Sequence, residues 1–197
     1  MYKITFVLIF MILFGITSAY SQEKKDTIVK KRLNYYSLAI GTGWSHYINS
    51  MELGKENAKE DFIDLSLRFL WEPEHRLSLG LETGYYRIFS VKSDSTNEMA
   101  GEAKLYALPL LLVVRMRIVD HFYLSVAPGM ALLFSKVDAA GNKSSSMILS
   151  AANFEATASY IYPLGKRFSV GGELRFFSIG KTNDFLYSVN AVCAVKL

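Results

Sequence analysis

The stretch "HRLSLGLETGYYRIF" at residues 75–89 alternates between apolar and non-apolar side chains almost without error. One set of alternate positions holds Leu77, Leu79, Leu81, Thr83 and Tyr85, and the other holds Ser78, Gly80, Glu82, Gly84 and Tyr86. A period of two predicts a β-strand with one apolar face and one polar or small face. The class of protein therefore depends on whether the apolar face contacts a soluble core or lipid.

Seven further segments carry a similar pattern, so that eight strands are expected. These segments are residues 34–47, 62–71, 104–118, 121–135, 147–162, 166–179 and 184–197. The segment 104–118 is apolar on both faces, and only Arg115 and Arg117 fix its phase. The segment 147–162 has the weakest pattern, because alanine and serine dominate it.

The connections between these segments alternate in length. Short links occupy residues 72–75, 119–120 and 163–165, and long polar links occupy residues 48–61, 92–103 and 136–146; the last link, 180–183, is short. Outer-membrane barrels have short periplasmic turns and longer external loops. The alternation therefore favours strands that cross a membrane, with three external loops.

The amino terminus has the pattern of an export signal. Lys3 precedes the apolar run at residues 4–16, and Ala19 and Ser21 occupy the small-residue positions of a cleavage site. The apolar run is shorter than the roughly 20 residues that a membrane-spanning helix needs. We expect a cleaved signal peptide at residues 1–21, a flexible periplasmic lead-in at 22–33 and the barrel at 34–197.

The non-apolar face also favours a membrane barrel over a soluble sandwich. It consists mainly of glycine, alanine and serine, which suit the narrow interior of an eight-stranded barrel. Six isolated charges lie among them: Arg68, Glu82, Arg115, Glu155, Glu173 and Arg175. Because a buried charge without a partner costs several kcal/mol, we expect these charges to pair across the lumen as an ionic plug. The alternative is that they line a conductive path.

Aromatic side chains lie toward the ends of the segments, where the interfacial girdles of a barrel belong. They are Tyr36, Trp44, Tyr47, Trp71, Tyr85, Tyr106, Phe122, Phe134, Tyr162 and Tyr187. The segments are also longer than the usual strands of soluble sheets. In lipid a sheet cannot leave an edge open. The sequence therefore predicts an all-β fold, an eight-stranded antiparallel up-and-down transmembrane β-barrel.

Three short runs carry a resemblance to a known family. The runs are "YALPLLL" at 106–112, Gly41 and Gly43 in the first strand, and "GGELRFF" at 171–177. With them, residues 34–197 resemble the small outer-membrane β-barrel family of Bacteroidota, also called porin-T-like. The resemblance implies an architecture like that of OmpA and OmpX. The chain departs from many such barrels in ending with Leu197 instead of Phe or Tyr.

The sequence offers no pattern for catalysis, a cofactor or a metal site. Ser45 and His46 are consecutive in a strand and should face opposite ways, with Glu52 in the following loop. We expect His75 and His121 to lie in periplasmic turns. The acidic residues at 60–64 and 94–98 lack the regular spacing of a calcium loop. Cys193 has no partner for a disulfide, because it is the only cysteine.

We therefore predict a non-catalytic integral protein of the outer membrane with an envelope-structural, adhesion or complex-assembly role. The alternatives are a component of a protein-secretion complex, a narrow pore for small solutes, and a soluble lipocalin-like carrier. The expected partners are outer-membrane lipid, lipopolysaccharide and the barrel-assembly machinery, with protein partners at the loops 48–61, 92–103 and 136–146. A net charge of +4 without a basic cluster gives no indication of nucleic-acid binding.

Overall fold

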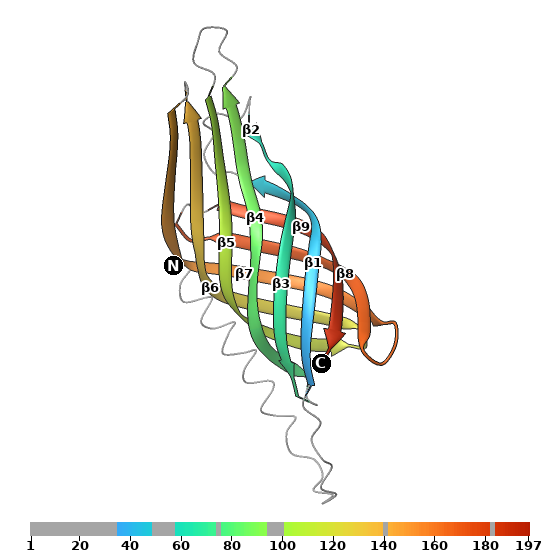
Figure 1. Cartoon of the computed structure of the whole chain (residues 1–197). Helices are drawn as coiled ribbons and strands as arrows, with labels where there is room; N and C mark the ends of the chain where they lie inside the picture. The colour runs from blue at the N-terminus through green and yellow to red at the C-terminus, as the bar shows by residue number, and fades with distance from the viewer. Residues whose placement is uncertain (1–34, 49–57, 74–75, 94–100, 140–141, 182–183) are drawn as a thin grey trace, which may run out of the picture. The chain divides into compact units, whose positions relative to one another are not determined.

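The computed structural model describes residues 35–48, 58–73, 76–93, 101–139, 142–181 and 184–197. The expected signal peptide and lead-in lie outside these residues. Eight long strands and one short one make up the described chain (Figure 1). They are β1 (Tyr35–Ile48), β2 (Ala58–Lys59), β3 (Asp61–Glu72), β4 (Leu77–Ser93), β5 (Gly101–Val119), β6 (Phe122–Ala139), β7 (Asn142–Pro163), β8 (Phe168–Ile179) and β9 (Asp184–Lys196).

The eight long strands form one closed antiparallel barrel. Each pairs with its neighbours in the chain, and the barrel closes where β1 pairs with β9, from Ser37 opposite Lys196 to Ile48 opposite Phe185. The short β2 pairs with β4 at two positions, Ala58 opposite Val91 and Lys59 opposite Ser90. The predicted fold class is confirmed. No helix within the described ranges is long and apolar enough to cross a membrane.

The barrel has two rims that differ in their connections. The connections at 73–76, 120–121 and 164–167 lie at one end, together with the start of β1 and the end of β9, and we call this end the short-turn rim. The other end carries the remaining connections and is called the loop rim. The turn at the short-turn rim between β5 and β6 contains His121 in a left-handed conformation, with φ of 68°.

The expected loop 136–146 is wrong for most of its length, and the expected loop 92–103 is wrong at both ends, while residues 94–100 lie outside the described residues. Strands β4 and β5 pair as far as Ser93 and Gly101, and β6 and β7 pair as far as Ala139 and Asn142. The alternation of apolar residues marks only the part of a strand that contacts lipid. A strand continues beyond that part wherever a neighbour satisfies its backbone N–H and C=O groups. For the same reason β7, expected to be the weakest strand, is the longest.

The apolar face of every long strand points outward, which answers the question raised by residues 75–89. On β4, Leu77, Leu79 and Leu81 are exposed, whereas Glu82 and Tyr86 are buried in the interior. The same outward apolar run occupies residues 63–71 of β3, 108–116 of β5 and 185–193 of β9. Each run matches the 9 to 11 residues of a tilted transmembrane strand. These exposed runs form an apolar band around the barrel, and the fold is that of a transmembrane β-barrel.

Candidate functional site

The interior is filled by side chains in successive layers. Nearest the loop rim lies an apolar layer, formed by Tyr47, Ile88, Leu133, Phe177, Ile179 and Leu186, all almost fully buried. Below it lies a charged layer, and Leu70, Leu111 and Val113 add further buried apolar side chains, Leu111 opposite Glu82 in the pairing of β5 with β4. Within the described residues, the large side chains of this apolar layer disfavour a polar path for an ion.

Arg68 is the centre of one half of the charged layer. Its Nε donates to Glu82 Oε2 at 2.6 Å on the neighbouring strand β4. Its Nη1 and Nη2 donate to Glu173 on β8 at 2.8 and 3.2 Å. The Arg68 side chain is 4% exposed and both carboxylates are fully buried. The guanidinium therefore joins two walls of the barrel.

Arg175 is the centre of the other half. Its Nη2 donates to Glu82 at 3.0 Å, to Glu173 at 2.8 Å and to the Ser66 hydroxyl at 2.9 Å. Its Nη1 donates to the Tyr86 hydroxyl at 2.7 Å, and Tyr86 in turn donates to Glu155 at 3.1 Å. The two arginines thus share both Glu82 and Glu173. Four strands are joined by one buried network.

The charged layer holds more carboxyl groups than guanidinium groups. Asp64, Glu82, Glu155 and Glu173 face only Arg68 and Arg175 among the described residues of this layer. Asp64 lies 3.9 Å from Arg175, and Oε1 of Glu155 lies 3.5 Å from Arg175 and 3.8 Å from Arg68. The network is therefore tightly paired at Glu82 and Glu173 and more loosely paired at Asp64 and Glu155.

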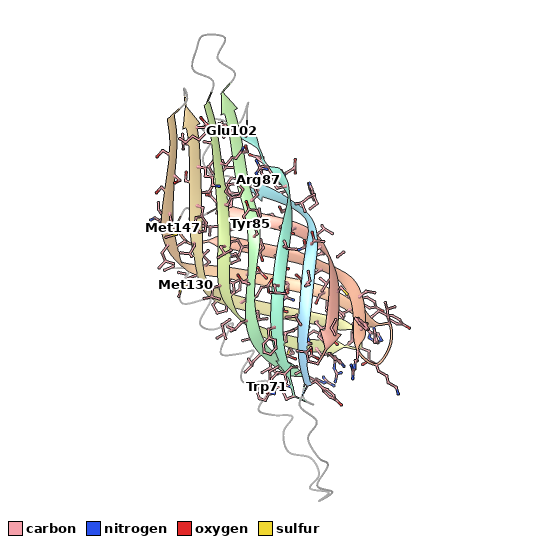
Figure 2. The ribbon with its side chains drawn as sticks, viewed as in Figure 1. Trp71, Tyr85, Arg87, Glu102, Met130 and Met147 are labelled. Atoms are coloured by element: carbon pink, nitrogen blue, oxygen red, sulfur yellow. The ribbon has the colours of Figure 1, made fainter. Side chains whose placement is uncertain are left out.

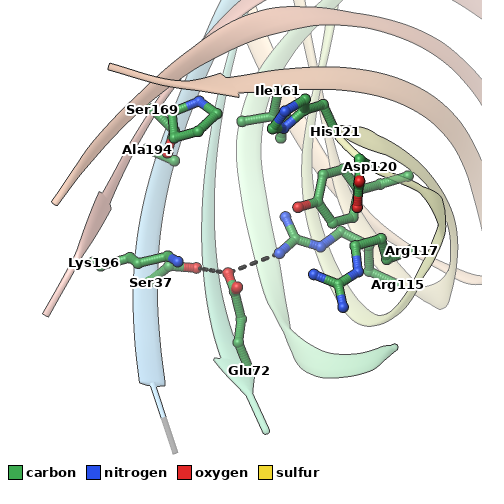
Figure 3. Close-up of a pocket in the computed structure, with 12 residues that line it drawn as sticks. Ser37, Glu72, Arg115, Arg117, Asp120, His121, Ile161, Ser169, Ala194 and Lys196 are labelled. Atoms are coloured by element: carbon green, nitrogen blue, oxygen red, sulfur yellow. Dashed lines mark hydrogen bonds and ion pairs between the residues drawn. The ribbon is translucent and has the colours of Figure 1, made fainter. Parts of the chain in front are cut away.

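Arg115 does not join this network, in contrast to the expectation that all six charges pair together. Its Nη2 donates to Glu72 at 2.7 Å, and its guanidinium lies 4.6 Å from the centre of the Tyr123 ring. Figure 3 shows this pair beside a cavity of about 200 Å³ at the short-turn rim. Arg115 and Glu72 line this cavity, and they lie closer to the short-turn rim than the residues of the charged layer do.

The expected aromatic residues lie at two levels along the barrel. Tyr36 opposite Trp71, with Phe122, lies near the short-turn rim. Toward the loop rim lie Trp44, Tyr85, Tyr106, Phe134 and Tyr187. Among the ten residues, Tyr106, Phe122 and Phe134 are half-buried, and the others except Tyr47 are exposed. Tyr47 was wrongly placed with them, because its odd-numbered position on β1 points inward, where it is 3% exposed.

Strands β4 to β7 extend beyond the rest of the barrel at the loop rim (Figure 1). Pairing continues there from Ser93 opposite Gly101 to Ala139 opposite Asn142. We call this part, residues 89–93, 101–105, 135–139 and 142–149, the projecting sheet. Figure 2 shows side chains on both of its faces, with Glu102 on it, Arg87 at its base and Trp71 at the opposite rim.

Among the described candidates, Ser45, His46, Asp61 and Asp64 do not form a catalytic or metal site. Ser45 points inward and donates to the carbonyl of Phe62, whereas His46 points outward and lies 2.9 Å from Asp61. Asp61 is exposed and Asp64 is buried, so the two carboxyl groups lie on opposite faces of β3. No cluster of metal-binding side chains occurs in the part of the chain that the structure describes. Glu52, His75 and residues 94–98 lie outside that part.

The alternation already placed Tyr86 on the non-apolar face, but Asp64, Glu72 and Tyr86 were not among the six groups expected to pair in the lumen. All three occupy inward positions of β3 or β4, in phase with Arg68 or Glu82. Strict use of the alternation would have found them. Which charges meet could not be found in this way, because it depends on the stagger between strands.

Fold and lumen together define a small eight-stranded transmembrane barrel with a filled interior. No protein-family model matches the sequence, and no curated protein matches it. Among solved structures, the fold is similar to that of Ail, the attachment invasion locus protein of Yersinia pestis, in complex with the heparin analogue sucrose octasulfate. The identity is 12%, the TM-score is 0.51, and the match covers 83% of this chain and 99% of Ail. Neisserial surface protein A matches with 15% identity and a TM-score of 0.49, over 83% of this chain and 97% of that protein.

Proposed function

We propose that this protein is a non-catalytic integral protein of the bacterial outer membrane that acts through its projecting sheet, in adhesion or in assembly of a complex. The proposal rests on one observation: at the loop rim, the paired strands continue beyond the end of the apolar band. The apolar band ends near Tyr85 and Leu108, whereas β4 and β5 continue to Ser93 and Gly101. A barrel with a purely structural role has no need of paired strands outside the lipid.

The filled interior disfavours the two alternatives that need an open or apolar lumen. A pore requires a polar path, and the layer containing Tyr47, Phe177 and Leu186 interrupts it. A lipocalin-like carrier requires an apolar interior and a polar exterior, which is the reverse of the arrangement around Arg68 and Leu67. A role in protein secretion rests only on the resemblance of residues 106–112 and 171–177 to porin-T-like proteins.

The similar structure bears on the proposal only through its fold. Ail is named as an attachment invasion locus protein. A fold of this kind is thus used by a protein named for attachment. Contact of the present chain with lipopolysaccharide and with the barrel-assembly machinery is part of the same proposal, since an integral outer-membrane barrel meets both.

Gel mobility and conductance test the membrane part of the proposal. We expect the outer-membrane fraction to contain a form that migrates faster before boiling than after boiling, as folded barrels do. The purified barrel should give no conductance steps in a planar lipid bilayer in which a known porin conducts. A soluble periplasmic protein without a mobility shift would contradict the membrane location, and regular conductance steps would contradict the closed lumen.

Labelling of intact cells tests the display of the projecting sheet. In a Cys193→Ser background, Ser145→Cys places a thiol on the exposed part of β7, and Val119→Cys places one at the short-turn rim. We expect a membrane-impermeant maleimide to label position 145 on intact cells and position 119 only after lysis. Labelling of both positions before lysis, or of position 119 alone, would contradict the proposed orientation.

A further inference from the structure

The cavity of about 200 Å³ at the short-turn rim is lined by positively charged side chains. Arg115 and Arg117 come from β5, and Lys196 comes from the end of β9. In the view of Figure 3, the two arginines lie on one side of the cavity and Lys196 lies on the other. Two acidic residues, Glu72 and Asp120, also line it. Positive charges therefore exceed negative charges among the described lining residues.

The deepest cation of the cavity has a donor that the protein leaves unused. Nη2 of Arg115 donates to Oε1 of Glu72 at 2.7 Å, and the same oxygen accepts from the hydroxyl of Ser37. Nε of Arg115 has no hydrogen-bond partner among the described residues, although the side chain is only 5% exposed. A buried donor without a partner is unfavourable, and an acceptor atom inside the cavity would remove that cost.

The rim around the cavity adds further positive charge. The backbone N–H of Arg117 donates to the carbonyl of Arg76 at 2.7 Å, and that of Lys196 donates to the carbonyl of Arg167 at 2.8 Å. Each cation of the cavity therefore has a second basic residue beside it. Within the described part of the rim, none of these four side chains forms an ion pair. Such a concentration of unneutralised positive charge attracts anions.

The size of the cavity and the placement of its donors indicate the class of anion. Sites for drug-sized molecules have volumes of roughly 300–1,000 Å³, so that this cavity suits a smaller group. Strands β5 and β9 lie opposite each other in the closed ring of eight, and their guanidinium and ammonium groups therefore approach a ligand from different directions. Both groups are common ligands of phosphate oxygens. A phosphate monoester offers three terminal oxygens to such donors, whereas a carboxylate offers two.

We propose that the cavity at the short-turn rim binds a small phosphate group, either inorganic phosphate or the phosphate of a monoester, between the arginines of β5 and Lys196 of β9. In the proposed orientation of the barrel this rim faces the periplasm, so that the ligand is a soluble periplasmic compound. The anion is held at the rim, because the charged layer above holds more carboxyl groups than guanidinium groups. The site goes beyond the proposed function, which places adhesion or assembly at the opposite rim.

Equilibrium dialysis with radiolabelled inorganic phosphate tests the site directly. The barrel is kept in a maltoside detergent, which contains no phosphate, and the ionic strength is held constant with sodium chloride. Only protein that shows the heat-dependent gel shift is used. We expect saturable binding of one phosphate per barrel.

Two lysine variants of the same rim locate the site. Lys196 lines the cavity, whereas Lys166 lies at the same rim outside it, and both are exposed. Because a charged hydrogen bond is lost, we expect Lys196→Gln to weaken phosphate binding about tenfold, and the matched control Lys166→Gln to leave it unchanged. Arg117→Gln should weaken binding as Lys196→Gln does.

A variant that fills the cavity separates binding inside it from general attraction to a positive rim. Ala194→Phe adds bulk at a lining position of β9 and keeps every charge. We expect it to abolish phosphate binding. General attraction would instead leave Ala194→Phe unaffected and would make the two lysine variants equally weak.

Competition identifies the chemical source of the phosphate. We expect glycerol 3-phosphate to displace the labelled phosphate, and acetate or a short-chain phosphatidylglycerol to displace it only weakly. Acetate as effective as glycerol 3-phosphate would make the cavity a carboxylate site, and a more effective lipid would make it a headgroup site; either result overturns the proposal. Absence of saturable binding, or equal effects of Lys166→Gln and Lys196→Gln, would also overturn it. These failures leave the membrane barrel and its proposed function standing, since the protein tested has already shown the gel shift.

Discussion

Arg68 and Glu173 meet across the lumen, with Nη1 of Arg68 2.8 Å from Oε2 of Glu173, although β1 and β9 separate their strands β3 and β8 in the barrel wall. The same guanidinium donates to Glu82 on β4. A bond of this kind connects segments that are distant in the sheet as well as in the sequence. It therefore helps to fix the diameter of the barrel.

We expect Arg68→Met to lower the free energy of unfolding by about 3–5 kcal/mol, because removal of one partner leaves Glu82 and Glu173 with uncompensated buried charge. Urea unfolding of the barrel in detergent, followed by tryptophan fluorescence, measures this change. Lys143→Met is the control, since the Lys143–Asp138 pair is long and exposed. An Arg68→Met barrel as stable as the control would show that the charged layer is not what holds the walls together.

Glu155→Gln should behave differently from Glu82→Gln. Glu155 keeps one hydrogen bond, from Tyr86, and its other oxygen has none. Glutamine retains an acceptor for Tyr86 and relieves the excess of carboxyl groups. We expect the free energy of unfolding to change by less than about 1 kcal/mol for Glu155→Gln and to fall by about 2–3 kcal/mol for Glu82→Gln. Equal losses in the two variants would mean that every carboxylate of the layer is needed.

Arg115→Met should have a smaller effect than Arg68→Met. Arg115 has one carboxylate partner, Glu72, which is 21% exposed and therefore partly solvated. We expect a loss of about 1–3 kcal/mol, since a charged hydrogen bond is removed but Glu72 stays in contact with water. A double-mutant cycle with Glu72→Gln isolates the pair. A loss equal to that of Arg68→Met would place Arg115 in the same cooperative network.

The outward and inward faces of the barrel could be predicted from the sequence because lipid and a narrow lumen select opposite residue types. Leu79 and Glu82 lie three positions apart on β4 and therefore face opposite ways. Because they differ so much in polarity, they decide which face of β4 contacts lipid and which lines the lumen. The pairing of Arg68 with Glu173 could not be predicted, because it depends on the stagger of four strands. The length of β6 beyond Ser135 and of β7 before Met147 was also hidden, since a strand in water needs no apolar alternation.

Gly171 and Gly172 are adjacent on β8 and should respond in opposite ways to alanine. A Cβ at Gly171 would lie 2.8 Å from the Ile161 Cα and even closer to the Tyr160 carbonyl, both rigid backbone atoms, whereas at Gly172 the nearest atom is 3.9 Å away. We expect Gly171→Ala to reduce the yield of the heat-modifiable form markedly and Gly172→Ala to leave it unchanged. Similar yields would mean that β8 can shift relative to β7.

The depth of the apolar band is tested by placing the same charge at two exposed positions. Leu112 lies in the middle of the band on β5 and is 54% exposed, and Met147 lies on the projecting sheet and is 62% exposed. For Leu112→Arg we expect a loss of about 2–4 kcal/mol in unfolding from lipid vesicles, the cost of an arginine near the midplane of a bilayer. For Met147→Arg we expect almost no loss, because water solvates the guanidinium there. Equal losses would place the projecting sheet in lipid and remove the surface through which the protein is proposed to act.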